Sequence, residues 1–195
     1  MHMGTEFYSE EELLYFKFKK IGKNVKIKKN VSIFFTENVT IGNNVRIDDN
    51  VIIVASGSET IIGSYVHIAA NCYLAASAGF IMEDFSGLAP GVNIFTGSDD
   101  YTGKKLTNPT VGGEFIGGMS GRVILKKHVI VGSGTVILPN VTIGEGSSVG
   151  ALSLVSKKLD EWGVYFGIPV KRLKARSKNL LALEKDFIKK IKNEL

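Results

Sequence analysis

The sequence predicts an all-β fold, a parallel β-solenoid in which short strands stack coil upon coil. Three observations support this prediction: an aliphatic residue returns at every sixth position, a small or β-branched residue follows four positions later, and glycine or asparagine recurs between them. In an α-helix every sixth residue would be scattered around the axis, whereas short strands joined by tight corners point each of them inward. The 22 glycines tolerate the positive φ that such corners require.

The six-residue period is most regular between residues 125 and 155. Its aliphatic positions are Leu125, Val131, Ile137, Ile143, Val149 and Val155. Its small or β-branched positions are Val129, Thr135, Val141, Ser147 and Ser153. The same period begins at Ile21 and returns as far as Ile94, so we expect a solenoid over residues 21–160. Since no single coil can bury its own core, stability should accumulate along the stack.

Both ends of the chain carry helical signals. Ser9 precedes three glutamates, which predicts an N-capped helix within residues 8–20 that covers the open end of the first coil. Ser177 is expected to cap a second helix within the C-terminal segment, residues 161–195. Its apolar stripe consists of Leu180, Leu183 or Ala182, Phe187 and Ile191, for which a neighbouring subunit is the natural partner. Residues 1–7, including His2, are interpreted as a vector remnant and set aside.

Length and composition place the chain among globular proteins. Its 195 residues favour a single domain, and its shares of apolar (44%) and charged (22%) residues argue against a disordered chain. No apolar run is long enough to cross a bilayer. Cys72 is the single cysteine, which excludes an intrachain disulfide and a multi-cysteine zinc site and favours a cytoplasmic setting.

The positive charge is concentrated near the C-terminus. The whole chain has a formal charge of +5, and residues 157–195 contain 11 Lys and Arg but only 5 Asp and Glu. Such a basic tail is usually a solvated helix face. A small polyphosphate ligand is the next interpretation, and nucleic acid is the least favoured partner.

Residues 96–121 interrupt the period. They contain many turn-forming residues and no six-residue repeat, and a long excursion from a regular solenoid is usually functional. The alternative is a disordered insertion. Tyr101, Leu106 and Phe115 are expected to give the loop apolar side chains with which to pack.

The sequence resembles the hexapeptide-repeat acyltransferases in three features. They are the repeats, the long loop, and the run from Ile137 to Leu159 that is followed by Gly167-Ile-Pro-Val-Lys171. The similarity is to the galactoside and maltose O-acetyltransferases and their sugar-nucleotide relatives, and it covers residues 20–175. The resemblance implies a left-handed β-helix, a homotrimer, and acetyl-CoA bound as co-substrate in a groove between subunits, without a metal ion. The acceptor would lie beneath the long loop.

The resemblance also suggests which residues bind coenzyme A. Backbone groups beside small side chains would line the pantetheine arm, and basic residues would offset the phosphates. These candidates are Gly132, Ser133, Gly150, Ala151, Pro169, Lys171, Arg172 and Arg176. The alternative is a basic entry to the final helix that binds no ligand.

At the catalytic position the sequence departs from the family pattern. Where galactoside-type enzymes have a general-base histidine, this chain has Asp99, followed by Asp100. His67 and His128 are either surface residues or one of them is the base, with its ring oriented by that aspartate pair. Two histidines are too few for a three-histidine zinc site.

The resemblance places Asn71 where the family holds the acceptor sugar. Further candidates for acceptor binding are the acidic and polar residues Glu83, Asp84, Tyr101 and Asn108. A sugar hydroxyl must lose its proton as it attacks a thioester, whereas a neutral amine is already nucleophilic. Loss of the loop histidine therefore favours an amino acceptor over a hydroxyl.

We therefore expect an acetyl-CoA-dependent N-acetyltransferase that acts on a nucleotide-linked amino sugar in the synthesis of a surface glycan, such as O-antigen, capsule or S-layer. One alternative is an O-acetyltransferase that acts on a sugar hydroxyl. The other is a non-catalytic trimeric scaffold or binding module, which would have no need of the long polar loop.

Overall fold

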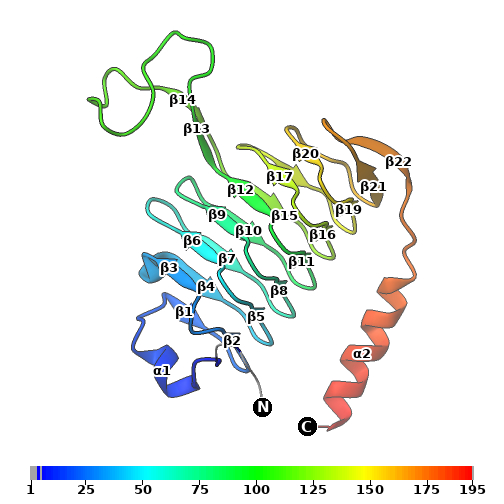
Figure 1. Ribbon diagram of the computed structural model, residues 1–195. Coiled ribbons are helices and arrows are strands. Elements are labelled where there is room, and N and C mark those ends of the chain that lie inside the picture. Colours follow the sequence, from blue (N-terminus) through cyan, green and yellow to red (C-terminus); the bar gives the residue numbers. More distant parts are fainter. Residues whose placement is uncertain (1–3, 5, 195) are drawn as a thin grey trace.

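The computed structural model describes residue 4 and residues 6–194, and the solenoid is its body (Figure 1). Its short strands form three parallel faces, so the predicted all-β fold class is confirmed. The first face contains β1 (Lys20–Ile21), β4 (Val39–Ile41), β7 (Thr60–Ile62), β10 (Phe80–Met82), β15 (Val123–Leu125) and β18 (Thr142–Ile143). His2 lies outside the described residues.

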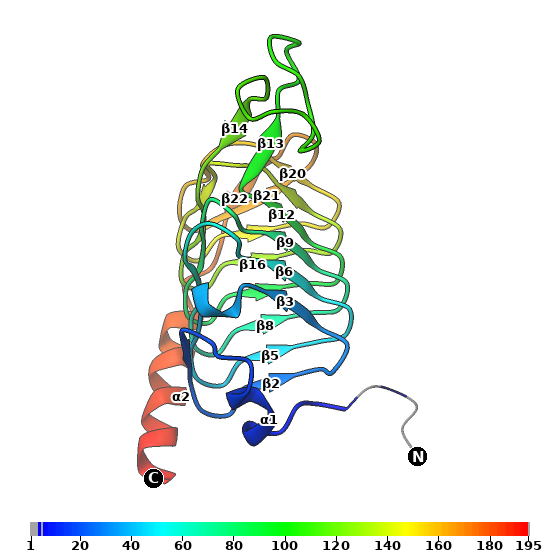
Figure 2. The same ribbon diagram turned by 90° about the vertical axis from the view of Figure 1, so that its left-hand side faces the viewer.

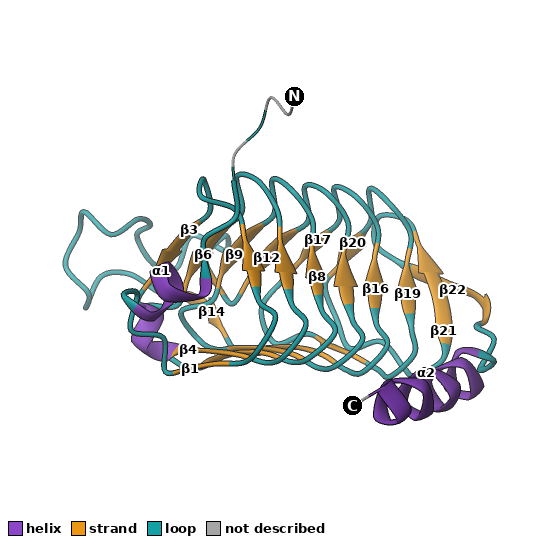
Figure 3. Ribbon diagram, turned by 90° about the horizontal axis from the view of Figure 1, so that it is seen from below, coloured by secondary structure: helices purple, strands orange, loops and turns teal. Residues whose placement is uncertain are grey.

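The other two faces follow the first around each coil (Figure 3). The second face contains β2 (Lys26–Ile27), β5 (Arg46–Ile47), β8 (His67–Ile68), β11 (Gly87–Leu88), β16 (Ile130–Val131), β19 (Ser148–Val149), β21 (Gly163–Phe166) and the antiparallel β22 (Lys171–Ala175). The third face contains β3 (Ser32–Phe34), β6 (Ile52–Val54), β9 (Tyr73–Ala75), β12 (Asn93–Phe95), β17 (Val136–Ile137) and β20 (Leu154–Val155). We number the corners in chain order: the first joins the first and second faces, the second joins the second and third, and the third leads to the next coil.

The six-residue period forms the core. All six aliphatic positions between residues 125 and 155 are buried, and so are the five small or β-branched positions between them. Neighbouring coils are joined by backbone hydrogen bonds, for example from Gly42 N to Ile62 O at 2.8 Å. Each coil therefore shields the core of the next, as the period predicts.

Residues with a positive φ stack along the corners. The first corner has Asn24, Asn44, Tyr65, Phe85, His128, Gly146 and Trp162 at these positions, with φ between 53° and 65°. Asparagine is common at these stacked positions because its side-chain amide also forms a hydrogen bond with the asparagine of the neighbouring coil. Asn24 Nδ2 donates to Asn44 Oδ1 at 2.7 Å, and on the second corner Asn50 Nδ2 donates to Asn71 Oδ1 at 3.3 Å.

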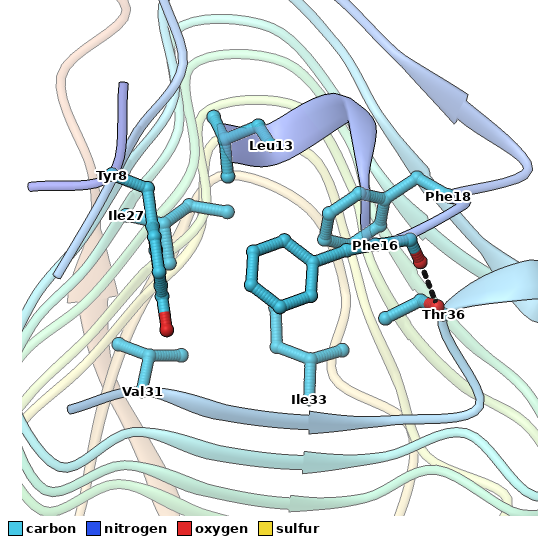
Figure 4. A pocket seen from close by; sticks show the side chains of 8 residues that line it. All are labelled: Tyr8, Leu13, Phe16, Phe18, Ile27, Val31, Ile33 and Thr36. Carbon is cyan, nitrogen blue, oxygen red and sulfur yellow. Dashed lines mark hydrogen bonds between the residues drawn. The ribbon is translucent and has the colours of Figure 1, made fainter. Parts of the chain in front are cut away.

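The N-terminal helix α1 (Glu10–Leu14) covers the first coil. Ser9 and Glu12 form a capping box, as the sequence suggests, but the helix ends well before residue 20 because Lys17 adopts a φ of 50°. Figure 4 shows Leu13 and Phe16 directed toward the aliphatic end of the solenoid. A short 3₁₀ turn, η1 (Thr36–Asn38), completes this end. Glu6 and Phe7, in the segment interpreted as a vector remnant, also contact the first coil.

The C-terminal helix α2 (Leu180–Glu194) begins later than Ser177. The Ser177 hydroxyl accepts a hydrogen bond from Asn179 N at 3.2 Å, so it closes a short turn before the helix. The helix then runs back beside the first corner, where Glu184 contacts His128 and Phe187 contacts Phe85 (Figure 3). No helix of residues 6–194 is both long enough and apolar enough to span a membrane.

Among the residues that the structure describes, one fully buried side-chain oxygen lacks a hydrogen-bond partner, Oγ1 of Thr60. Thr60 begins β7 between Val39 and Phe80 of the neighbouring coils. We expect Thr60→Val to raise Tm by about 2–4 °C, since it keeps the shape of the side chain and removes an unsatisfied hydroxyl.

Thr96→Val is the matched control for this measurement by differential scanning fluorimetry. Thr96 is equally buried, but its hydroxyl donates to Ala75 O at 2.8 Å and accepts from Ala78 N at 2.9 Å. This variant should lower Tm, because Ala78 N would lose its partner. A lower Tm for Thr60→Val would show that its hydroxyl has a stabilising role.

Candidate functional site

The long loop leaves the stack at the third corner. We call residues 96–121 the ribbon loop, because β13 (Gly97–Asp99) and β14 (Gly118–Ser120) pair antiparallel and carry its tip away from the solenoid (Figures 1 and 2). It lies between β12, which ends at Phe95, and β15, which begins at Val123. The regular stack thus presents a polar loop far from its core.

The two aspartates of the ribbon loop have different environments. Asp100 accepts hydrogen bonds from Thr102 N and Oγ1 and from the backbone N–H groups of Lys104 and Lys105, at 2.7–2.8 Å. The bond from the Thr102 hydroxyl is the main reason that the pKa of Asp100 is lowered. Asp100 therefore organises the tip. Asp99 is exposed and has one long contact, from Asn108 N at 3.4 Å, so it is the more available carboxylate.

The apolar residues of the ribbon loop are exposed within one chain. Tyr101 is 92% exposed, Leu106 57% and Phe115 55%, so they do not form a buried cluster within one chain, although Leu106 N donates to Phe115 O at 2.9 Å. Local hydrogen bonds hold the tip instead, including those of Asp100 and that from Thr110 N to Asn108 Oδ1 at 3.0 Å. The loop presents its apolar side chains outward.

His67 is held by an aspartate of the neighbouring coil. Its Nε2 lies 2.7 Å from Asp48 Oδ2, and the same carboxylate accepts from Arg46 Nε at 2.7 Å. Partial burial raises the pKa of Asp48, but the hydrogen bonds from His67 and Arg46 outweigh it and leave the pKa below its usual value. Within one chain it is Asp48, and neither Asp99 nor Asp100, that orients this ring, because His67 lies on the second face.

His128 is buried beneath α2. It is 7% exposed, its ring stacks on Phe85 at 5.3 Å, and its Nε2 lies 2.8 Å from Glu184 Oε2. Lys127 Nζ pairs with the other oxygen of Glu184. Burial raises the pKa of Glu184, but its bonds to Lys127 and His128 outweigh burial and lower it overall. Here too, the ring partner is not the aspartate pair of the loop.

Glu83 and Asp84 bind neighbouring coils at the first corner. Glu83 pairs with Lys126 Nζ at 2.7 Å and accepts from Lys127 N at 3.0 Å, while Asp84 accepts from Ser64 N at 2.7 Å. Within one subunit Glu83 and Asp84 lie at the first corner, whereas the ribbon loop leaves the stack at the third corner. A combined acidic site would therefore need residues from more than one subunit.

Most of the residues suggested for coenzyme A gather on the second corner. They are Gly132, Ser133, Gly150, Ala151 and Pro169, and Asn71 lies on the same corner some coils earlier. The stacking of the coils is a further reason for small residues at positions 132 and 150. A Cβ on Gly132 would lie 2.4 Å from Ala151 N, and one on Gly150 would lie 2.3 Å from Phe166 Cδ2. The backbone of the next coil thus requires glycine at position 132, whereas at position 150 the neighbour is the half-exposed ring of Phe166.

The second corner also has an apolar rim that the sequence analysis missed. Leu152 is 70% exposed, Phe166 52% and Ile168 73%. Lys171 begins β22 directly opposite Phe166. These apolar residues interrupt the polar pattern of the corners, and this interruption could have revealed the rim from the sequence. A corner with exposed apolar groups and a lysine can bind an amphipathic, anionic ligand.

The basic residues of the C-terminal segment diverge. Lys171 is near the second corner, whereas Arg172 Nη2 makes a long contact with Trp162 O at 3.4 Å. Arg176 Nη1 donates to His128 O at 2.8 Å and to Gly146 O at 3.0 Å. Partial burial lowers the pKa of Arg176. The predicted phosphate-binding set therefore does not form one cluster in a single chain.

The described residues contain no group of three His, Cys, Asp or Glu side chains arranged to hold a metal ion. The site residues that remain are an exposed carboxylate on a projecting loop, Asp99, and a second corner with an exposed apolar rim beside Lys171. Asp48 and Glu184, which fix the two histidines, were not predicted, since they lie 19 and 56 residues away from them. Aligning the sequences of successive coils would have placed Asp48 next to His67.

Comparison with known proteins agrees with this architecture. Residues 122–157 match the family described as bacterial transferase hexapeptide (six repeats). The chain is 37% identical to a dTDP-4-amino-4,6-dideoxy-D-glucose acyltransferase of Escherichia coli, over 93% of this chain and 94% of that protein.

Solved structures extend the comparison. The N-acyltransferase AntD from Bacillus cereus, in complex with dTDP and 3-hydroxybutyryl-CoA, is 43% identical over 96% of this chain and 99% of that one, with a TM-score of 0.92. A maltose O-acetyltransferase from Clostridium difficile shares the fold, with 21% identity over 86% of this chain and 75% of that one and a TM-score of 0.59. The chain belongs to the hexapeptide-repeat acyltransferases, with the sugar-nucleotide N-acyltransferases as its near relatives.

Proposed function

We propose that this protein transfers an acyl group from coenzyme A to the amino group of a nucleotide-linked amino sugar, with dTDP-4-amino-4,6-dideoxyglucose as the best candidate acceptor. One observation carries the proposal. A serine variant of AntD, 44% identical over 97% of this chain, was solved with that amino sugar and coenzyme A, and its TM-score is 0.91. Acetyl is the acyl group expected from the sequence, and 3-hydroxybutyryl is the alternative that the AntD complex suggests.

The chemistry of this proposal needs no histidine base. The neutral amine attacks the thioester carbonyl, the amide forms as the carbon–sulfur bond breaks, and coenzyme A leaves as its thiol. His67 and His128 are held by Asp48 and Glu184, away from the ribbon loop. Asp99 is the available carboxylate, and its charge would attract the ammonium form of the acceptor and can take its proton. An acceptor hydroxyl would need a stronger base than this site offers.

We place the active site between subunits of a homotrimer. Two features support this assembly. Leu183 and Phe187 of α2 are 61% and 42% exposed, and the ribbon loop projects apolar side chains that its own chain does not cover. A second subunit would bury both surfaces. The product would serve synthesis of a surface glycan from the cytoplasm, a setting with which the single, buried Cys72 is compatible.

The function is tested by thiol release. The purified chain is incubated with acetyl-CoA or 3-hydroxybutyryl-CoA and with matched sugar nucleotides that bear either an amine or a hydroxyl at the acylated position. Free thiol should appear with the amino sugar and remain at background with the hydroxy sugar. Release with the hydroxy sugar alone would support O-acylation, and none with any acceptor would favour the scaffold alternative.

The histidine variants test the mechanism. His67→Asn and His128→Asn should each lower kcat less than about 100-fold, because neither imidazole accepts the acceptor proton. Asp99→Asn should raise the KM for the amino sugar, and Asp100→Asn serves as a control for disturbance of the loop tip. A loss of about 10³-fold or more confined to one histidine, with Tm unchanged, would identify that residue as the base.

Charge removal tests the coenzyme site. Lys171→Ala with Arg172→Ala should raise the KM for acyl-CoA, more at low salt than at high salt, with kcat at saturation nearly intact. Because Lys171 lies by the apolar rim and Arg172 points toward Trp162, Lys171→Ala should account for most of the effect. Lys157→Ala, an exposed lysine on the third corner, is the control. An unchanged KM would place the phosphates elsewhere.

Analytical ultracentrifugation tests the assembly. The active species should sediment as a trimer, and Phe187→Ser should promote dissociation together with loss of activity, because it removes apolar contact area. A monomer with full specific activity would contradict the intersubunit site.

A further inference from the structure

The N-terminal end of the stack exposes an apolar surface that the proposed function does not use (Figures 1 and 2). We call Leu14, Tyr15, Phe16 and Phe35 the end patch. All four are exposed, Leu14 by 72% and Tyr15 by 84%. The first three end or follow α1, and Phe35 precedes η1. The Thr36 hydroxyl donates a hydrogen bond to Phe16 O, which joins these two segments into one surface.

Covering the first coil does not require the end patch. Leu13 of α1 is buried against the coil, whereas Leu14 and Tyr15 remain outside, although the outer face of a terminal repeat is usually polar. Phe35 has a φ of 62°, which is unfavourable for a bulky side chain. At the first corner such rings stack on one another, but Phe35 makes no ring contact among the described residues. The end patch therefore has the properties of a contact surface.

Hollows lie beside these protruding side chains. On one side of α1, Tyr8, Phe16 and Ile33 help to line an apolar hollow of about 50 Å³ (Figure 4). A second hollow, of about 190 Å³, is lined by residues that include Glu10, Leu14 and Lys23. A surface that carries both protrusions and hollows can pack against a second copy of itself, because a two-fold axis brings each feature against the partner's surface.

The charges around the end patch select the partner. Glu10 and Glu11 begin α1, Lys20 and Lys23 lie in and just after β1, and all four are exposed. Among the described residues none of these four side chains forms an ion pair. A two-fold axis would bring the glutamates of one copy toward the lysines of the other. An anionic membrane surface, in contrast, would repel the glutamates.

We infer that the end patch binds the end patch of a second copy of this chain, so that two trimers meet through their N-terminal ends. The inference takes the homotrimer from the proposed function and adds a second interface at α1, whereas the ribbon loop follows β12 several coils further on. A cyclic trimer presents its three N-terminal ends on the same side. Three end patches therefore engage three others at once, which strengthens a contact that is weak for a single pair.

Analytical ultracentrifugation of the full-length protein over a range of concentrations tests this interface. The wild-type protein should reach twice the mass of its trimer as the concentration rises. Leu14→Ser with Tyr15→Ser should raise the Kd between trimers at least about ten-fold, because the apolar contact is lost. Leu173→Ser is the matched control: it removes a leucine that is 64% exposed on β22, at the opposite end of the chain, and should alter this Kd by less than about two-fold.

Charge reversal tests the two-fold arrangement. Glu10→Lys with Glu11→Lys makes the charges around the end patch positive, and Lys20→Glu with Lys23→Glu makes them negative. Each variant alone should stay at the mass of one trimer, because like charges would face each other across the axis. A mixture of the two variants should recover the doubled mass, and added salt should weaken this recovery.

The outcomes separate the possibilities. A wild-type protein that never doubles its mass would overturn the inference, as would charge variants that do not recombine or wild-type protein that binds anionic vesicles instead. Growth into longer species, reduced by Leu173→Ser, would indicate a head-to-tail contact and overturn it too. Acyl transfer is measured in parallel. An active trimer that never doubles refutes only this interface, whereas a doubled but inactive protein refutes only the proposed function.

Discussion

Hydrogen bonding of each coil to the next is the constraint on which the rest of this structure depends. Strands such as β7, β10 and β15 pair in register, so each inward residue lies over its counterpart and each outward residue forms part of a column. Insertions within a face would break this register. Additions to the fold are therefore confined to the corners and to the chain ends, and the ribbon loop and α2 are found there.

The three corners consequently have different roles. The third releases the ribbon loop, where Asp99 is exposed. The second keeps small residues because neighbouring coils approach closely at Gly132 and Gly150, and its apolar rim faces solvent. The first is joined to α2 through the contact between His128 and Glu184. Both described histidines are thus used to hold coils and helix together, in agreement with chemistry that an amine can carry out without a histidine base.

The first corner also shows how the structure offsets local strain. Tyr65, Phe85 and His128 have φ values of 58–63°, a conformation that costs bulky residues on the order of 1 kcal/mol each. In return their rings stack on one another, and Phe187 packs against Tyr65 and Phe85. These aromatic contacts hold α2 over one edge of the second face.

The sequence by itself determined the solenoid, its inward residues and the position of the ribbon loop, because a six-residue period is a local pattern that directly specifies which side chains point inward. It also indicated the family and the departure at Asp99. Only the tertiary structure decided which side chains meet: Asp48 with His67, Glu184 with His128, and Phe166 above Gly150. These contacts depend on how coils stack and on where α2 returns, and neither is encoded in the spacing of residues within one repeat.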